Sequence, residues 1–88
     1  MKLTQNQIDT IIEGLENPNT RLEVFWRNHD LYAKFVCKKN TENITGSYDV
    51  ESNNKPYFRA TKKGIIDWFE EKEKLSTFEL ITETRIKI

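Results

Sequence analysis

The strongest cluster of residues that could do chemistry lies between residues 55 and 63. This segment holds four basic side chains and no acidic one. Basic side chains neutralise phosphate groups, and a neighbouring aromatic ring can stack on a nucleic-acid base. The segment is therefore a candidate binding site for nucleic acid or for an acidic partner, made of Lys55, Tyr57, Arg59, Lys62 and Lys63. The alternative is a solvated turn whose aromatic rings belong to the core.

A second candidate surface consists of residues suited to protein contacts. Phe25, Tyr32 and Val36 are apolar at strand positions where the alternation predicts polar residues. They form an exposed patch if both helices cover the other face of the sheet, and they are buried if the helices cover both faces. A C-terminal strand containing Arg85 and Lys87 offers another interface, because an edge strand can pair with a partner's strand or with a second copy of itself.

The other reactive residue types show no catalytic or metal-binding pattern. His29 is the one histidine and lies in a turn beside Asp30, and Cys37 falls in register with buried strand positions. One histidine and one cysteine do not make a tetrahedral zinc site without carboxylates brought from elsewhere. The three glycines are too scattered for a phosphate-binding loop. We therefore expect no enzymatic activity, no cofactor and no metal ion.

Length and charge narrow the class of protein further. The chain has 88 residues, enough for a single small domain over residues 1–88. It carries 14 basic and 14 acidic side chains, so the formal net charge is zero and gives no general argument for nucleic-acid binding. One cysteine forms no internal disulfide, and no stretch is apolar enough to span a membrane. We expect a cytoplasmic protein with no membrane partner, and the many Lys, Ile and Asn residues are typical of AT-rich bacterial and phage genomes.

Helical and strand patterns alternate along the chain. Thr4 and Gln7 form a capping-box pattern, and the apolar spacing that follows predicts a helix over residues 5–16. A period of two over residues 21–37, broken at 28–30, predicts a β-hairpin. A third strand is expected with Ile44, Tyr48 and Val50 facing inward, and Gly46 is interpreted as the site of a bulge.

The second half of the chain also contains helix and strand patterns. A turn-rich connection at 51–56 and a short extended piece at 57–60 lead into a helix over residues 62–74, for which Thr61 is the expected N-cap. Alternation over residues 78–88 predicts a long last strand. The expected fold is α+β: one domain with an antiparallel sheet of three to five strands, two helices on one face, and the order α-β-β-β-(β)-α-β.

One segment resembles a known family. Phe58-Arg59-Ala60-Thr61-Lys62-Lys63-Gly64, followed by an apolar helix, is similar to the passage from wing strand to last helix in winged-helix transcription regulators. In that family the wing contacts the DNA backbone, so the resemblance implies such a role for Lys55, Arg59, Lys62 and Lys63. The element order also resembles the double-stranded RNA-binding domain, in which lysines near the start of the second helix contact phosphates.

The sequence favours a non-enzymatic protein-binding regulator or inhibitor of the kind that phages and mobile elements encode. Zero net charge permits association without long-range repulsion, and the chain holds aromatic residue types that are enriched at interface hot spots. The alternative hypothesis is a nucleic-acid-binding module that uses residues 55–63. A homodimer formed through the C-terminal edge strand is a further expectation.

Overall fold

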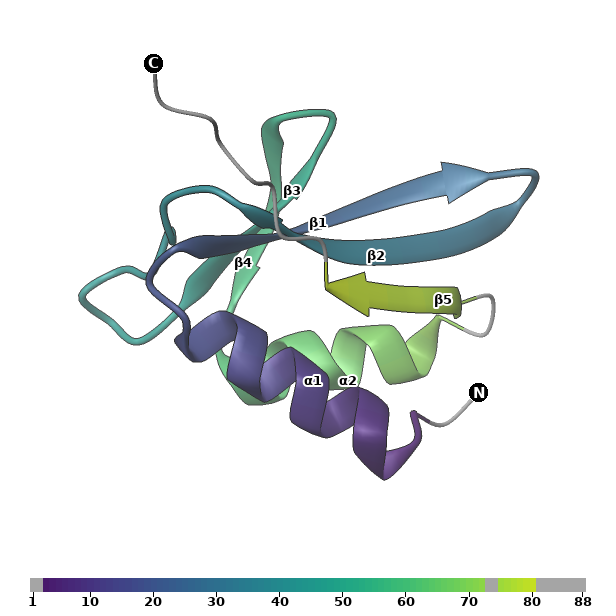
Figure 1. Cartoon of the computed structure of the whole chain (residues 1–88), viewed down its shortest axis with the longest axis horizontal. Coiled ribbons are helices and arrows are strands. Elements are labelled where there is room, and N and C mark those ends of the chain that lie inside the picture. Colours follow the sequence, from purple (N-terminus) through teal and green to yellow (C-terminus); the bar gives the residue numbers. More distant parts are fainter. Residues whose placement is uncertain (1–2, 73–74, 81–88) are drawn as a thin grey trace, which may run out of the picture.

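The computed structural model describes residues 3–72 and the backbone of residues 75–80. Two helices and five strands make up one α+β domain (Figure 1). In chain order they are α1 (Gln5–Glu16), β1 (Thr20–Arg27), β2 (Asp30–Cys37), β3 (Tyr48–Ser52), β4 (Lys55–Ala60), α2 (Lys62–Glu71) and β5 (Leu75–Leu80). The predicted fold class and element order are therefore confirmed.

Local signals define the ends of both helices. The Thr4 hydroxyl accepts a hydrogen bond from the Gln7 amide at 3.1 Å, and the Gln7 side chain accepts one from the Thr4 amide at 2.9 Å. This reciprocal pair satisfies two amides that the first turn of α1 leaves free. The Thr61 hydroxyl caps α2 in the same way, since it accepts from the Gly64 amide at 3.2 Å.

In each hairpin a tight turn that begins with asparagine connects the two strands. Asn28 and His29 connect β1 to β2, and Asn53 and Asn54 connect β3 to β4; all four have positive φ. Two consecutive residues of positive φ form the turn whose twist matches that of the flanking strands, and asparagine tolerates that conformation best after glycine. The turn at residues 28–29 aligns β2 with the whole length of β1.

The sheet is mixed, so the prediction of a purely antiparallel sheet is wrong. Its strand order is β4-β3-β1-β2-β5, in which β3 runs parallel to β1 and β5 runs parallel to β2. After β2 the chain passes to the far side of β1 instead of turning back along β2, and α2 later carries it from β4 to β5. A parallel neighbour requires a long crossover of this kind, which strand patterns alone do not reveal.

The third strand begins later than predicted. β3 starts at Tyr48, and Ile44 is fully exposed on the preceding loop instead of facing the core. The loop closes on itself, because Asn43 donates from its amide to the Ser47 carbonyl and Gly46 donates to the Asn43 carbonyl. Gly46 has a φ of 78° and provides this turn, so it marks no bulge in a strand. Tyr48 and Val50 do face inward as predicted.

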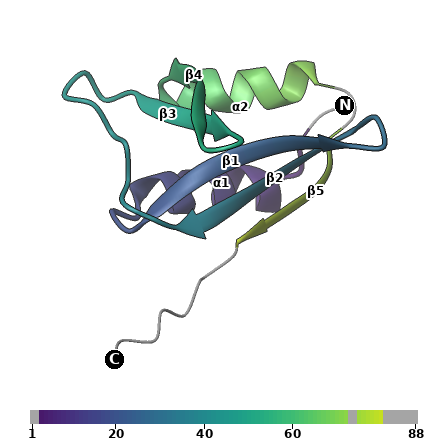
Figure 2. The ribbon, with the colours of Figure 1, turned by 90° about the horizontal axis from the view of Figure 1, so that it is seen from above.

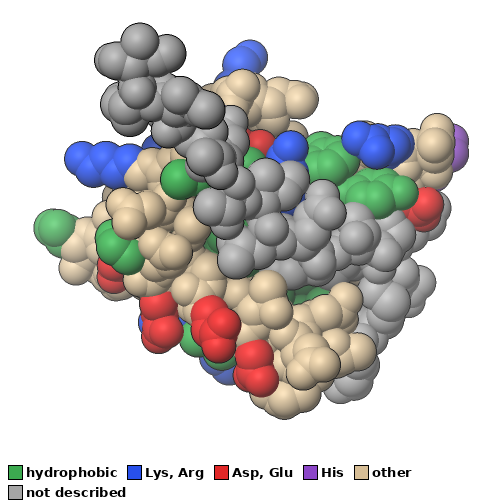
Figure 3. Space-filling model, viewed as in Figure 1, with side chains coloured by type: hydrophobic (Ala, Val, Ile, Leu, Met, Phe, Trp, Pro, Cys, Tyr) green, Lys and Arg blue, Asp and Glu red, His purple; other side chains and the backbone are tan. Residues whose placement is uncertain are grey.

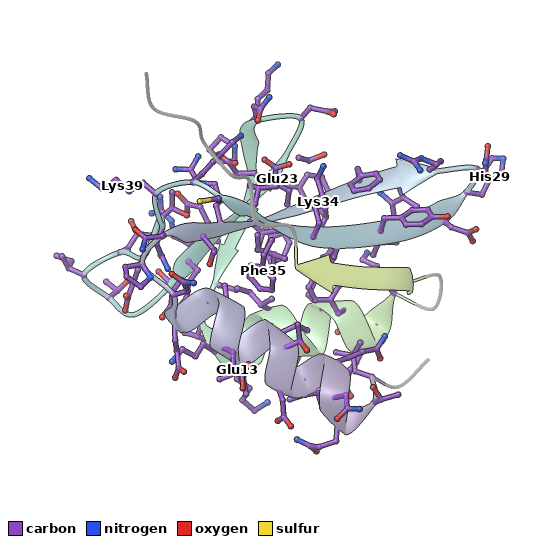
Figure 4. All side chains as sticks on the ribbon, in the orientation of Figure 1. Glu13, Glu23, His29, Lys34, Phe35 and Lys39 are labelled. Carbon is purple, nitrogen blue, oxygen red and sulfur yellow. The ribbon has the colours of Figure 1, made fainter. Side chains whose placement is uncertain are left out.

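Both helices cover the same face of the sheet (Figures 1 and 2). The core between the two layers combines helix residues such as Ile11 and Phe69 with strand residues such as Leu22, Leu31 and Phe35, each at most 1% exposed. Phe35 points from β2 toward the helices (Figure 4). The prediction of helices on one face is confirmed, and within residues 3–72 and 75–80 no helix lies on the opposite face.

Gly14 allows α1 to approach the sheet. A Cβ atom built at this position would lie 2.4–2.6 Å from three atoms of the Phe35 ring, closer than such atoms can approach. Phe35 is fully buried, so its ring has little room to move away. The missing side chain of Gly14 therefore sets the distance between α1 and β2.

We expect Gly14→Ala to lower the free energy of unfolding by about 1–2 kcal/mol, because overpacking of about 1–3 kcal/mol outweighs the helix propensity that alanine gains, about 1 kcal/mol. Urea unfolding monitored by circular dichroism measures the change. Glu13→Ala, at an exposed neighbouring position of α1, is the matched control and should leave stability nearly unchanged. When Phe35 is replaced by leucine, Gly14→Ala should lower the free energy of unfolding by less, because the ring that meets the new Cβ atom is gone. Equal stability of Gly14→Ala and the natural protein would contradict this packing.

Candidate functional site

The helix-free face of the sheet is charged at its centre, and its charges are paired. Arg21 of β1 donates from Nη1 to Oε2 of Glu51 on β3 at 2.6 Å. The Glu51 side chain is 7% exposed, so this ion pair is largely withdrawn from water. Beside it, Lys38 lies 3.2 Å from Glu23 and also donates to the Asn54 side chain at 2.7 Å. These pairs bind β1 to β3 and to the loop after β2.

Toward the tip of the β1–β2 hairpin, the described side chains form no further ion pairs. There the Phe25 and Tyr32 rings stack across the two strands, with centroids 5.4 Å apart and planes 11° from parallel. The Arg27 guanidinium lies 5.4 Å from both ring centroids, and the Lys34 ammonium lies 5.3 Å from that of Phe25. We call these four residues the hairpin patch. In Figure 3 hydrophobic and basic side chains lie together at this end of the molecule, next to the purple histidine.

The structure brings together two of the three apolar residues predicted as an interface. Phe25 and Tyr32 are partly exposed and in contact. Val36 lies on the same face of β2 but is 7% exposed, so it offers almost no surface to a partner. Arg85 and Lys87 lie outside the described residues. Of the last strand predicted over residues 78–88, the structure describes residues 78–80, which end β5 (Leu75–Leu80) at an edge of the sheet. Dimerisation through this strand stays a prediction.

Sequence reasoning missed Arg27 and Lys34 as members of this surface. The signal was present, because a two-residue turn at 28–29 aligns Phe25 with Tyr32 and leaves Arg27 and Lys34 two residues away on the same face. Side chains at such diagonal positions on neighbouring strands are close enough to touch when one is aromatic and the other is long. Lys34 and Glu23 both rise from the helix-free side of the hairpin (Figure 4).

A groove of about 420 Å³ lies beside the hairpin patch. Its lining consists of Glu23–Arg27 of β1, Lys34 of β2, and the turn residues Asn53 and Asn54. It forms because the β3–β4 hairpin diverges from β1 beyond the single paired position Glu23 and Glu51. The groove and the hairpin patch share Phe25, Arg27 and Lys34, so we treat them as one candidate surface.

The basic segment 55–63 is spread over two elements, and a carboxylate lies beside most of its cations. Arg59 of β4 donates to Asp49 of β3 at 2.6 Å. At the start of α2, Lys62 donates to Glu16 of α1 at 3.0 Å. Among the described residues, Lys55 is in no ion pair.

Hydrogen bonds to carboxylates stabilise the charged forms of these cations. The bond from Lys63 to Asp67, 2.8 Å long and one helical turn away, raises the pKa of the lysine. Bonds to Glu16 and Asp49 likewise raise the pKa values of Lys62 and Arg59. Lys62 lies at the positive end of α2 and Glu16 at the negative end of α1, so their contact relieves two unfavourable helix-dipole interactions. A phosphate group would have to compete with these carboxylates.

The aromatic member of the segment packs against α2. Tyr57 is 51% exposed, and its ring centroid lies 6.0 Å from that of Trp68 and 5.9 Å from that of Phe58. Both contacts are edge-to-face, a favourable arrangement for neighbouring rings. Tyr57 therefore belongs in part to the aromatic packing around α2. Burial raises the pKa of the core residue Tyr48 above its usual value.

The described residues contain no group of three or more histidine, cysteine, aspartate or glutamate side chains arranged to hold a metal ion. His29 is exposed at the hairpin tip (Figure 4), and Cys37 is a partly buried free thiol. No helix in this part of the chain is long and apolar enough to cross a membrane.

Comparison with known proteins adds no relative: no family model, no curated protein and no solved structure matches the chain. The resemblance to winged-helix regulators stays a prediction.

We expect Arg21→Met to lower the free energy of unfolding by about 2–4 kcal/mol, because it leaves the Glu51 carboxylate buried without its cation. Replacing both residues by methionine should restore most of this loss. Urea unfolding of the two single variants and the double variant measures the coupling. Lys63→Met, which breaks the exposed pair with Asp67, is the control and should change stability little. A double variant less stable than Arg21→Met would contradict this account.

Proposed function

We propose that this chain is a non-enzymatic protein-binding module, a small regulator or inhibitor, and that the hairpin patch contacts its partner. The observation that carries the proposal is the stacked pair of Phe25 and Tyr32, flanked by Arg27 and Lys34 on a sheet face without a helix. Aromatic and arginine side chains are the types that dominate protein–protein hot spots.

The surroundings of the patch support this proposal. The groove beside it offers a concave wall, and Trp26, which lines the groove, is 50% exposed. A partner that covers Phe25 and Tyr32 would bury a stacked pair of aromatic side chains at this end of the molecule. The ion pairs at the centre of the same face would form a polar border, as is common around an interface core.

Replacing Phe25 and Tyr32 by serine should weaken partner capture at least about tenfold, because hot-spot truncations cost about 2 kcal/mol or more. Tagged protein is used to capture partners from a lysate, half of it treated with nuclease. We expect a protein retained in stoichiometric amount after nuclease treatment by the natural chain and lost from the double variant. Tyr57→Ser removes an exposed ring outside the patch and is the matched control. Equal capture by both variants would contradict a role for the patch.

Nucleic-acid binding through residues 55–63 is the alternative. The carboxylates beside Arg59, Lys62 and Lys63 count against it, because phosphate binding would break the existing ion pairs. We expect no saturable binding of single-stranded DNA or RNA in fluorescence polarisation at low salt. Saturable binding that falls steeply with salt and disappears in Arg59→Glu with Lys63→Glu would move the function to this segment.

A further inference from the structure

The edge of β1 is open over its second half. β2 pairs with all of β1, from Thr20 to Arg27, but on the other side β3 pairs with β1 at a single position, Glu23 with Glu51. Beyond that position β1 has one neighbouring strand among the described residues. An internal strand of a sheet normally has two, so Phe25–Arg27 form a free edge inside the sheet order.

The hairpin turn decides which backbone groups this edge presents. In a hairpin with a two-residue turn, the pair next to the turn exchanges hydrogen bonds, and hydrogen-bonded pairs then alternate along the strands. Arg27 and Asp30 are that first pair. The backbone N–H and C=O groups of Phe25 therefore also bond to β2, and those of Trp26 do not. The N–H and C=O groups of Trp26 therefore point away from β2 and into the groove.

The groove is placed to receive an extended chain. It runs along Glu23–Arg27 and is closed on the far side by Asn53 and Asn54. Its volume of about 420 Å³ accommodates a few residues beside β1 without displacing a structural element. A strand added there would pair with the free edge, which is a common way to bind a peptide.

Charge selects the kind of peptide. Arg27 and Lys34 line the groove, and neither is in an ion pair with a residue whose side chain the structure describes. The one acidic side chain of the lining, Glu23, is already paired with Lys38. The groove therefore carries an excess of positive charge, although the chain as a whole has none.

We propose that the free edge of β1 binds an extended acidic segment of the partner protein by strand addition, an inference that rests on the proposed protein-binding function. Backbone pairing at Trp26 supplies the alignment, and Arg27 and Lys34 bind the carboxylates. A nucleic-acid ligand fits less well, because the chain's own cations already lie over the Phe25 and Tyr32 rings on which bases would stack.

The test uses the full chain and a labelled peptide of about six residues, a usual strand length, that alternates valine with glutamate. Fluorescence polarisation at physiological salt compares it with the peptide in which lysine replaces glutamate. We expect saturable binding of the glutamate peptide alone. Two N-methylated forms, blocked at the valine or at the glutamate amides, test backbone pairing, because an added strand uses alternate amides. At least one should bind about tenfold more weakly or worse.

Matched variants test the charge. Arg27→Glu should weaken binding of the glutamate peptide at least about fivefold, roughly 1 kcal/mol. Lys39→Glu makes the same charge change at an exposed lysine far from the hairpin tip (Figure 4) and should leave the affinity within about twofold, because salt screens charges beyond about 8 Å. Urea unfolding of both variants confirms that each remains folded.

Three outcomes would overturn strand addition. The first is that the glutamate peptide shows no saturable binding. The second is that both N-methylated forms bind as tightly as the unmethylated peptide. The third is that the site at Arg27 binds a single-stranded oligonucleotide, or a second copy of the chain, more tightly than the peptide. If strand addition fails while partner capture still depends on Phe25 and Tyr32, the protein-binding function stands without it. If the peptide binds but partner capture does not depend on Phe25 and Tyr32, the site at the edge of β1 is supported and the role of the hairpin patch is not.

Discussion

The contact between Gly14 and the Phe35 ring is the constraint on which the remaining structure depends. The ring fills the space that a side chain at residue 14 would occupy, and this brings α1 down onto the middle of the sheet. α2 then packs beside α1, and Phe69 and Ile65 complete one continuous core. The core cluster of the described residues lies on this side, and the other face carries few apolar residues, among them Phe25, Tyr32 and Val36. The open face on which the candidate surface lies is therefore a consequence of how the core is built.

An open sheet face still has to keep its polar groups solvated or paired. Here the charged residues of β1 and β3 pair with one another across the strands, as Arg21 does with Glu51. Burying Glu51 without that cation would cost several kcal/mol, so the pair holds the two strands in register as well as neutralising the face. Opposite charges are thus neutralised by their neighbours at the centre of this face. At the hairpin tip Arg27 and Lys34 contact aromatic rings, and no described carboxylate side chain forms an ion pair with either.

The mixed topology produces the groove. Had β3 paired with β2, it would have continued the first hairpin, and β1 would have been an outer strand with no second hairpin opposite it. By crossing to the far side of β1, β3 meets it at one position and then diverges toward its own turn at Asn53 and Asn54. The groove and the free edge of β1 thus have a common origin in one crossover, and Arg27 and Lys34 lie beside them. Their coincidence at one place makes this end of the molecule the best candidate for a binding site.

Local sequence determined the elements, and only the tertiary structure decided their neighbours. The capping residues Thr4 and Thr61, the alternation of β1 and β2 and the two asparagine turns are local interactions, so the helices, the first hairpin and its inward face were predictable. Two features join residues far apart in the chain: the parallel placement of β3 beside β1 and the ion pair between Lys62 and Glu16. The exposure of Ile44 depends on a loop that closes on itself. The basic segment 55–63 shows the difference. Its basic residues are close together in the sequence, but the fold places a carboxylate from another element beside Arg59 and another beside Lys62. The physical reason is that charges far apart in the chain form ion pairs wherever packing brings them together.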